Sequence, residues 1–156
     1  MSKLVKPQNT LKQKVGHGGF KEEDLKKAQK SIEENTVDFK PIAIELLGSL
    51  DKTLLSIQKG TTDIKTSLGA ILDPIMQLRA QGSLFHYPSI THISDVVVDF
   101  LDTEKSIDKN ILEMLVAYKK AVDALLSLEI KDEKDKVCLA LVDELQNACI
   151  RYQQKK

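Results

Sequence analysis

Two side chains near the middle of the chain have the types and the spacing to position a reactive water molecule. Asp73 and Gln77 are four residues apart, so on a helix they share one face. An amide one turn from a carboxylate can orient a water molecule, provided that both side chains are exposed. Pro74 lies between them and is expected to interrupt or kink the helix, because proline removes one helical hydrogen bond.

The histidines are the other side chains suited to phosphoryl chemistry, because an imidazole nitrogen can accept a phosphoryl group. His86 belongs to the turn HYPS, and His92 follows in the next helical segment. His17 lies among glycines with no second ligand nearby, so no metal site is expected there. For His86 and His92 the sequence leaves two interpretations open, namely a surface position without chemistry or a phosphoryl acceptor.

The two cysteines, Cys138 and Cys149, form no catalytic or metal-binding pattern. On one helix they would share a face but lie ~16 Å apart along the axis, too far for a disulfide. Two cysteines without histidine neighbours make no zinc site. The segment GHGG is not a phosphate-binding loop, because the Lys-Ser/Thr pair of such loops is missing. We therefore expect neither a metal ion nor a cofactor.

Length, charge and hydropathy limit the class of protein. The 156 residues fit one domain, and 23 basic residues balance 23 acidic ones. A chain with no net charge is not expected to bind nucleic acid through bulk electrostatics. No apolar run approaches the ~20 residues of a membrane span, and no secretory signal is visible, so no membrane partner is expected. These features predict a cytoplasmic protein with reduced cysteines.

The segments that would position these groups follow helical spacing almost throughout. Residues 1–20 are basic and are expected to form a flexible leader. Residues 21–156 are expected to form a single domain that begins with a charged helix. Five amphipathic segments follow, with apolar residues three or four apart. The stripe of the first is Phe39, Ile42, Leu46, Leu50, Leu54 and Ile57, and that of the second is Ile64, Leu68, Ile71, Ile75, Leu78, Gly82 and Phe85.

The remaining three stripes complete an all-α pattern. They begin at Ile90, near Ser106 and at Cys138. No period-two alternation with a hairpin turn is present, so strands are not expected. The sequence predicts an antiparallel four-helix bundle with one or two additional helices. We expect a monomer, although the stripe of the last helix would suit a core or an interface equally well.

The segment with Ile75 has a second face beside its apolar stripe. At about 100° per residue, four residues lie about 140–200° from Ile75, namely Asp73, Gln77, Ala80 and Leu84. Met76 lies at the border between this second face and the apolar stripe, and Arg79 falls closer to the stripe. The face is either a solvated surface or a shallow apolar patch that another helix can cover.

Residues 76–88, MQLRAQGSLFHYP, resemble the segment that carries the active histidine in histidine-containing phosphotransfer (HPt) proteins. The resemblance is to a group of small alphaproteobacterial HPt-domain proteins, whose segment runs roughly His-Asp-(Ile/Leu)-Lys-Gly-Gln-Gly-Gly-(Ser/Thr)-Phe-Gly-Tyr-Pro. The residues that match are Gln81, Gly82, Phe85, Tyr87 and Pro88, with Leu78 at the apolar position. The amino-terminal NTLKQKVGHGGF, followed by KEEDLKKAQ, also resembles that group, so the resemblance touches both ends of the amino-terminal half.

This resemblance implies an HPt-like bundle in two-component signalling, including control of chemotaxis or motility. Met76 stands at the phospho-acceptor position, and its thioether cannot carry a phosphoryl group. Arg79 keeps the positive charge of the family's lysine, and Ala80 keeps a small residue. We therefore expect a pseudo-phosphotransfer module, rather than an enzyme, that binds a response-regulator receiver domain or a histidine kinase. The expected docking residues are Asp73, Met76, Gln77, Arg79, Ala80, Gly82, Ser83 and Leu84.

Two alternatives remain open at this point. In chemotaxis phosphatases of the CheZ type, an acid and an amide four residues apart on a helical bundle dephosphorylate a receiver. Asp73 and Gln77 have that arrangement. In the other alternative, His86 or His92 replaces the missing acceptor and phosphotransfer is genuine.

Overall fold

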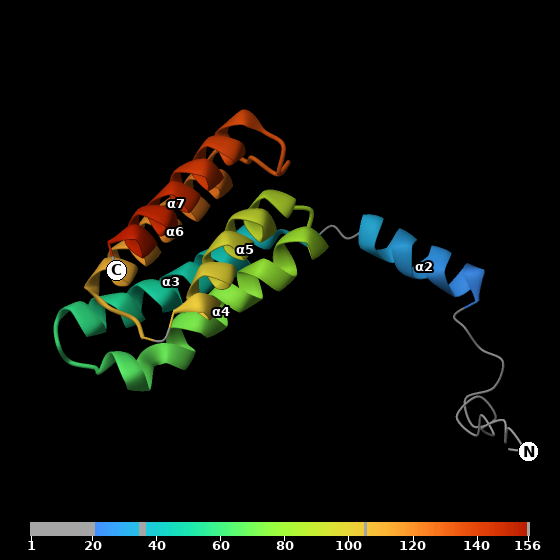
Figure 1. Ribbon diagram of the computed structural model, residues 1–156. Coiled ribbons are helices and arrows are strands. Elements are labelled where there is room, and N and C mark those ends of the chain that lie inside the picture. The colour runs from blue at the N-terminus through green and yellow to red at the C-terminus, as the bar shows by residue number, and fades with distance from the viewer. Residues whose placement is uncertain (1–20, 35–36, 105, 156) are drawn as a thin grey trace, which may run out of the picture. The chain divides into compact units, whose positions relative to one another are not determined.

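The computed structural model describes residues 21–34, 37–104 and 106–155, and within these ranges the chain is helical with no strand. Figure 1 shows the six described helices, which are α2 (Glu22–Glu33), α3 (Phe39–Gln58), α4 (Ile64–Leu84), α5 (Pro88–Thr103), α6 (Lys109–Ser127) and α7 (Lys136–Gln154). The all-α class predicted from the apolar spacing is confirmed. The expected leader, residues 1–20 with His17, lies outside the described residues.

The chain divides into two units, Met1–Asn35 and Thr36–Lys156. In the first unit, α2 buries none of its residues, and its two large apolar side chains, Leu25 and Ile32, are 54% and 46% exposed. A helix with so few apolar side chains has no stripe wide enough to build a core. The described helix of the first unit therefore adds no buried side chain to a core.

In the second unit, four helices form a closed ring in which α3 packs on α4, α4 on α5, α5 on α6, and α6 on α3. Successive helices run in opposite directions, as the colours in Figure 1 show. The last helix, α7, packs against α5 and α6. The unit is thus a helical bundle with one additional helix. Among the described residues, no helix is both long and apolar enough to cross a membrane.

The core confirms most of the predicted stripes and corrects some positions. In α4, Ile71, Ile75 and Leu78 are fully buried, whereas Leu68 is 42% exposed. Leu68 lines a hollow of about 350 Å³ between the start of α4 and the end of α5. In α3, Ala43 and Leu47 are buried, and the predicted Ile42 and Leu46 are only partly buried. The buried face of α3 is therefore wider than the predicted stripe, because α3 packs against both α4 and α6.

Polar contacts fix α5 to its surroundings at its first turn and near its middle. The hydroxyl groups of Ser94 and Tyr118 form a buried hydrogen bond of 2.7 Å between α5 and α6, and burial raises the pKa of Tyr118. The loop between α6 and α7 contacts the first turn of α5. There the Ser89 amide donates to the Lys131 carbonyl at 3.0 Å, and the Ser89 hydroxyl donates to the Ile130 carbonyl at 2.6 Å.

Candidate functional site: the outer face of α4 and its junction with α5

The α4 helix is continuous from Ile64 to Leu84 although Pro74 lies inside it. The predicted interruption at Pro74 is therefore wrong, whereas the predicted kink stays a prediction. A proline in a helix interior costs about 3 kcal/mol, and burial of its ring against the core offsets part of that cost. Because the helix continues, Asp73 and Gln77 lie one turn apart on one face, and both are exposed.

An exposed stripe runs along the outer side of α4. Met76, Ala80 and Leu84 follow one another at four-residue spacing, with Met76 45% exposed and Leu84 43% exposed. Asp73 and Gln77 run beside them. We call these five residues the α4 face. All of them are exposed, as the helical-wheel argument predicts, so the face is available to a partner.

Arg79 is bound by a carboxylate of the neighbouring helix. Its Nε donates to Oδ1 of Asp95 on α5, and the two side chains are 39% and 40% exposed. A half-exposed pair of this kind contributes about 0–1 kcal/mol to stability. The positive charge expected to meet a partner is thus largely neutralised within the bundle.

The hydroxyl of Thr91 on α5 joins the ends of α4 and α5. It donates to the Arg79 carbonyl at 2.9 Å and accepts from the Ser83 amide at 2.8 Å. The Ser83 hydroxyl also donates to it at 3.0 Å. Ser83, expected to contact a partner, is therefore engaged in this junction even though its side chain is exposed.

Gly82 lies where the end of α4 packs against the start of α5 without space for a side chain. A Cβ at this position would be 2.6 Å from the Thr91 hydroxyl oxygen, 2.9 Å from the Thr91 amide nitrogen and 3.0 Å from the Tyr87 carbonyl oxygen. Two of these atoms belong to the backbone and cannot move aside easily. Gly82 is buried, as its place in the predicted apolar stripe requires, and the absence of a side chain there allows the two helices to pack closely.

The turn after α4 is a Schellman motif, in which the chain reverses through a left-handed residue. His86 has φ +67°, and its amide donates to the Ser83 carbonyl at 3.2 Å. The next amide, of Tyr87, donates to the Gly82 carbonyl at 2.7 Å. The rings of Phe85 and Tyr87 lie 5.5 Å and 5.8 Å from the ring of Phe39, which fixes the turn against the start of α3.

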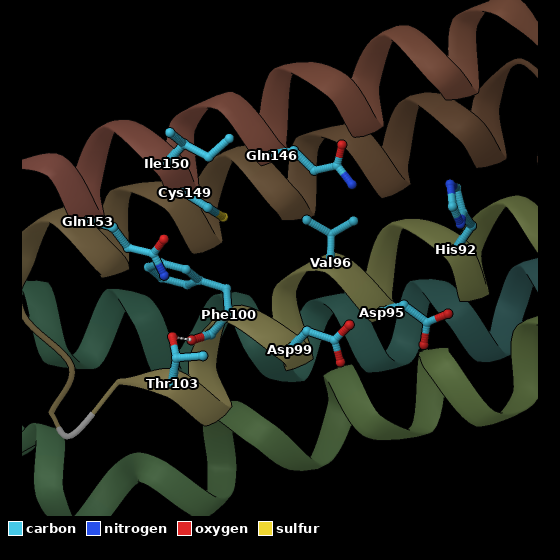
Figure 2. A pocket seen from close by; sticks show the side chains of 10 residues that line it. All are labelled: His92, Asp95, Val96, Asp99, Phe100, Thr103, Gln146, Cys149, Ile150 and Gln153. Carbon is cyan, nitrogen blue, oxygen red and sulfur yellow. Dashed lines mark hydrogen bonds between the residues drawn. The ribbon is translucent and has the colours of Figure 1, made fainter.

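Neither of the described histidines belongs to the α4 face. His86 is exposed in the turn, ~15 Å from Met76 at 1.5 Å per residue. His92 is half-buried on α5, and in Figure 2 its ring points towards α7, away from the carboxylates of Asp95 and Asp99. The structure therefore does not bring either imidazole to the position of Met76.

The two thiols are structural in character. Cys138 and Cys149 are free and buried on α7. Burial raises the pKa of Cys149 to about 11, and burial together with nearby carboxylates, Asp135 first, raises the pKa of Cys138. Both thiols are therefore protonated at neutral pH, and a thiol nucleophile is not available. Among the residues that the structure describes, no three His, Cys, Asp or Glu side chains gather in a way that would hold a metal ion.

A groove between α5 and α7 is the feature that the sequence analysis missed. It has a volume of about 570 Å³ and is lined by residues of both helices (Figure 2). One signal was present in the sequence, because Leu139 and Ile150 fall outside the apolar stripe of the last helix. In the structure they are 48% and 49% exposed.

Comparison of the chain with protein-family models, with curated proteins and with solved structures gives no match in any of the three. Its function is therefore argued from the α4 face and from the junction between α4 and α5.

Proposed function

We propose that the protein is an HPt-like binding module of two-component signalling. It docks a response-regulator receiver domain or a histidine-kinase domain through the α4 face and carries no phosphate itself. The partners of such modules are cytoplasmic, so we place this chain in the same compartment.

The observation that carries the proposal is the agreement between the backbone geometry and the glycines of the HPt segment. That segment has glycine at the positions of Ala80, Gly82, Ser83 and His86, and at two of these the backbone of this chain calls for glycine. At Gly82 the neighbouring helix leaves no room for a Cβ, and at His86 the backbone has φ +67°, which glycine adopts most readily. A short match by chance would have no reason to coincide with these two backbone requirements.

The acceptor position supports binding without phosphotransfer. Met76 lies on the exposed side of a bundle helix, where a phosphoryl acceptor would have to lie. Its thioether sulfur is neutral and cannot hold a phosphoryl group at that position. Arg79, the neighbouring cation, is already paired with Asp95. The face therefore offers apolar contact from Met76, Ala80 and Leu84 in place of phosphate chemistry.

Binding of purified receiver domains from the same cell tests the docking part of the proposal. Met76→Glu places a charge in the middle of the apolar stripe and is expected to weaken binding about tenfold or more. The matched control is Leu55→Glu, since Leu55 is 44% exposed on α3. Equal weakening by both variants, or no binding of any receiver or kinase domain, contradicts the proposal.

The lifetime of the receiver's phosphate tests the second part of the proposal, that the chain binds a receiver without phosphate chemistry. A receiver phosphorylated with a small-molecule donor should keep its phosphate for the same time with and without this chain. A transfer of phosphate to the chain, detected as an acid-labile adduct, would overturn the assignment of a non-catalytic module.

A second candidate is a receiver phosphatase of the CheZ type. The observation in its favour is that α4 continues through Pro74, and Asp73 and Gln77, four residues apart on it, are both exposed. In this case the chain shortens the phosphate lifetime, and Gln77→Ala abolishes the effect while binding is retained. The control is Gln58→Ala on α3, which changes an exposed amide on another helix.

A further inference from the structure

We propose that two copies of this chain associate through the groove between α6 and α7, each copy packing its groove on that of the other. The groove consists of two hollows of about 440 Å³ and 390 Å³, which share Ala117, Ala148 and Arg151 and so form one continuous surface. We call it the α6–α7 groove. It contains no residue of α4, which packs on α3 and α5. The inference therefore goes beyond docking through the α4 face, and it departs from the monomer expected from the sequence.

Contacts between α6 and α7 determine which residues lie opposite each other across the groove. The Tyr152 hydroxyl, near the end of α7, donates to Oδ2 of Asp108, just before α6, at 2.7 Å. Further along α6, the sulfur atoms of Met114 and Cys149 lie 3.3 Å apart. The two helices are therefore antiparallel, as Figure 1 also shows, and each step forward along α6 corresponds to a step back along α7.

Four charged side chains line the groove, and their signs alternate around it. Glu113 of α6 and Arg151 of α7 line one hollow. Lys120 of α6 and Glu144 of α7 line the other. On each helix the acid comes two turns before the base. All four side chains are exposed, and within the described ranges none of them makes an ion pair.

A two-fold axis parallel to the helices brings these opposite charges together. A two-fold interface uses the same surface of both copies, and this axis places α6 of each copy on α7 of the other. Glu113 of one copy then faces Arg151 of the second copy. Lys120 likewise faces Glu144 of the second copy. Each contact occurs twice, and no charge of the groove faces a like charge, so the surface is complementary to itself.

The same axis also brings exposed apolar side chains together. Ala117 and Ala148 lie between the charged pairs, and small side chains at a helix contact permit a short interaxial distance. Leu128 lies three turns after Ala117, and Val137 lies three turns before Ala148, so both lie beyond the same end of the groove. They are 62% and 41% exposed. In the dimer, Leu128 of one copy packs on Val137 of the other, which removes apolar surface from water.

The charge pattern favours a second copy over other occupants. A uniformly acidic or basic helix would face two like charges for every two opposite charges in the groove, whereas a second copy matches all four. A two-fold axis perpendicular to the helices would also pair each acid with the base of the same helix. That axis would carry Leu128 and Val137 past the ends of the partner's helices, so the parallel axis covers more of the exposed apolar surface.

Sedimentation of the full chain over a range of concentrations is the first test. The average mass should rise towards twice that of one chain, and added salt should weaken the association because part of it is electrostatic. Leu128→Asp places a charge against Val137 of the second copy and should weaken the association about tenfold or more. The matched control is Ile44→Asp on α3, because Ile44 is 60% exposed and should not contact the second copy.

Exchange of charge between two variants tests the direction of the axis. Lys120→Glu and Glu144→Lys each create like-charge contacts between two identical copies, so each variant alone should associate about tenfold more weakly. In an equal mixture, every contact between positions 120 and 144 joins opposite charges, so the mixed dimer should form in preference. Native mass spectrometry distinguishes it from the two homodimers. Lys52→Glu, an exposed position on α3, should associate as the unaltered chain does.

Three results overturn the proposal, provided that urea unfolding shows each variant to be folded. The first is the mass of a single chain at every concentration up to about 1 mM. The second is equal weakening by Ile44→Asp and Leu128→Asp. The third is a mixture of Lys120→Glu and Glu144→Lys that associates no more tightly than either variant alone. Each result is independent of whether a receiver domain binds the α4 face.

Discussion

The two sides of α5 are built in different ways. On the side of α4, contacts are polar and directional, with the Thr91 hydroxyl between Arg79 and Ser83 and with Arg79 bound to Asp95. On the side of α7, contacts are apolar and aromatic, such as the edge-on packing of Phe100 and Tyr152 at 5.5 Å between ring centroids. The α7 side also contains the groove of about 570 Å³.

The contact between α4 and α5 therefore fixes the relative position of the two helices, whereas the contact between α5 and α7 can adapt to a change in side chains. Hydrogen bonds at 2.8–3.0 Å and a glycine with no room for a Cβ permit one register of α4 against α5. Apolar contacts around an open groove tolerate a shift of α7 or the insertion of a partner side chain. Substitutions on the two sides should therefore differ in their effect on stability.

The largest effect is expected from Gly82→Ala. The added methyl group would lie 2.6 Å from the Thr91 hydroxyl and 2.9 Å from the Thr91 amide nitrogen. Overpacking of this kind costs about 1–3 kcal/mol, which exceeds the gain of ~1 kcal/mol from replacing a helical glycine by alanine. The free energy of unfolding in urea should therefore fall.

Gly69→Ala is the matched control for this prediction. Gly69 lies on the same helix, is exposed, and has no atom within 4 Å of a built Cβ. It should stabilise the bundle by about 0.5–1 kcal/mol. If Gly82→Ala is stabilising as well, the packing of α4 against α5 has room for a side chain at Gly82, and the contrast between the two sides of α5 is lost.

The next largest effect is expected from Thr91→Val. The change leaves the Ser83 amide without its partner and removes a donor from the Arg79 carbonyl, at a cost of about 1–2 kcal/mol. Thr103→Val is the control on the α7 side, because the Thr103 hydroxyl donates only to a carbonyl of its own helix. It should change the unfolding free energy by less than ~0.5 kcal/mol, and equal effects would remove the contrast between the two sides.

A smaller effect of opposite sign is expected from His86→Gly. His86 occupies the left-handed position of the turn that joins α4 to α5. Glycine adopts this conformation without steric strain, so the variant should be more stable by about 0.5–1 kcal/mol. Thermal unfolding measures the gain, and a loss of stability would show that the imidazole makes a contact that the turn needs.

The smallest effect is confined to alkaline solution and concerns Cys149 on the α7 side. Its ordinary pKa of 9.0 rises to about 11 in the folded chain because of burial. As the pH rises, the thiol of the unfolded chain loses its proton before that of the folded chain. The contribution of this thiol to the free energy of unfolding is therefore complete below pH 9 and is lost as the pH rises towards about 11. Urea midpoints at several pH values should fall less steeply for Cys149→Ala than for the unaltered chain, and parallel slopes would contradict this.

The sequence predicted the features that depend on helical rotation alone. Apolar spacing identified the helices, and the position of Met76, Ala80 and Leu84 relative to Ile75 identified the exposed face of α4. Spacing does not reveal which helices are neighbours. For this reason it assigned Leu68 to the core, overlooked Ala43 and Leu47, and gave no indication of the groove between α5 and α7.

One local rule of sequence interpretation failed where tertiary contacts decide the structure. Pro74 was expected to interrupt α4, but the helix continues and the ring is buried. Gly82 was placed both in the apolar stripe and among the docking residues, and it is buried against α5, as the stripe predicts.

The contact between Ser89 and the α6–α7 loop has a consequence for the order of folding. The start of α5 has no side-chain cap of its own, and the Ser89 amide is satisfied by the Lys131 carbonyl. Because this partner arrives only when a long intervening segment has closed, the first turn of α5 is completed late, after local helix formation. Hydrogen exchange at the Ser89 amide should therefore follow the opening of the α6–α7 loop, and not the fraying of the helix to which Ser89 belongs.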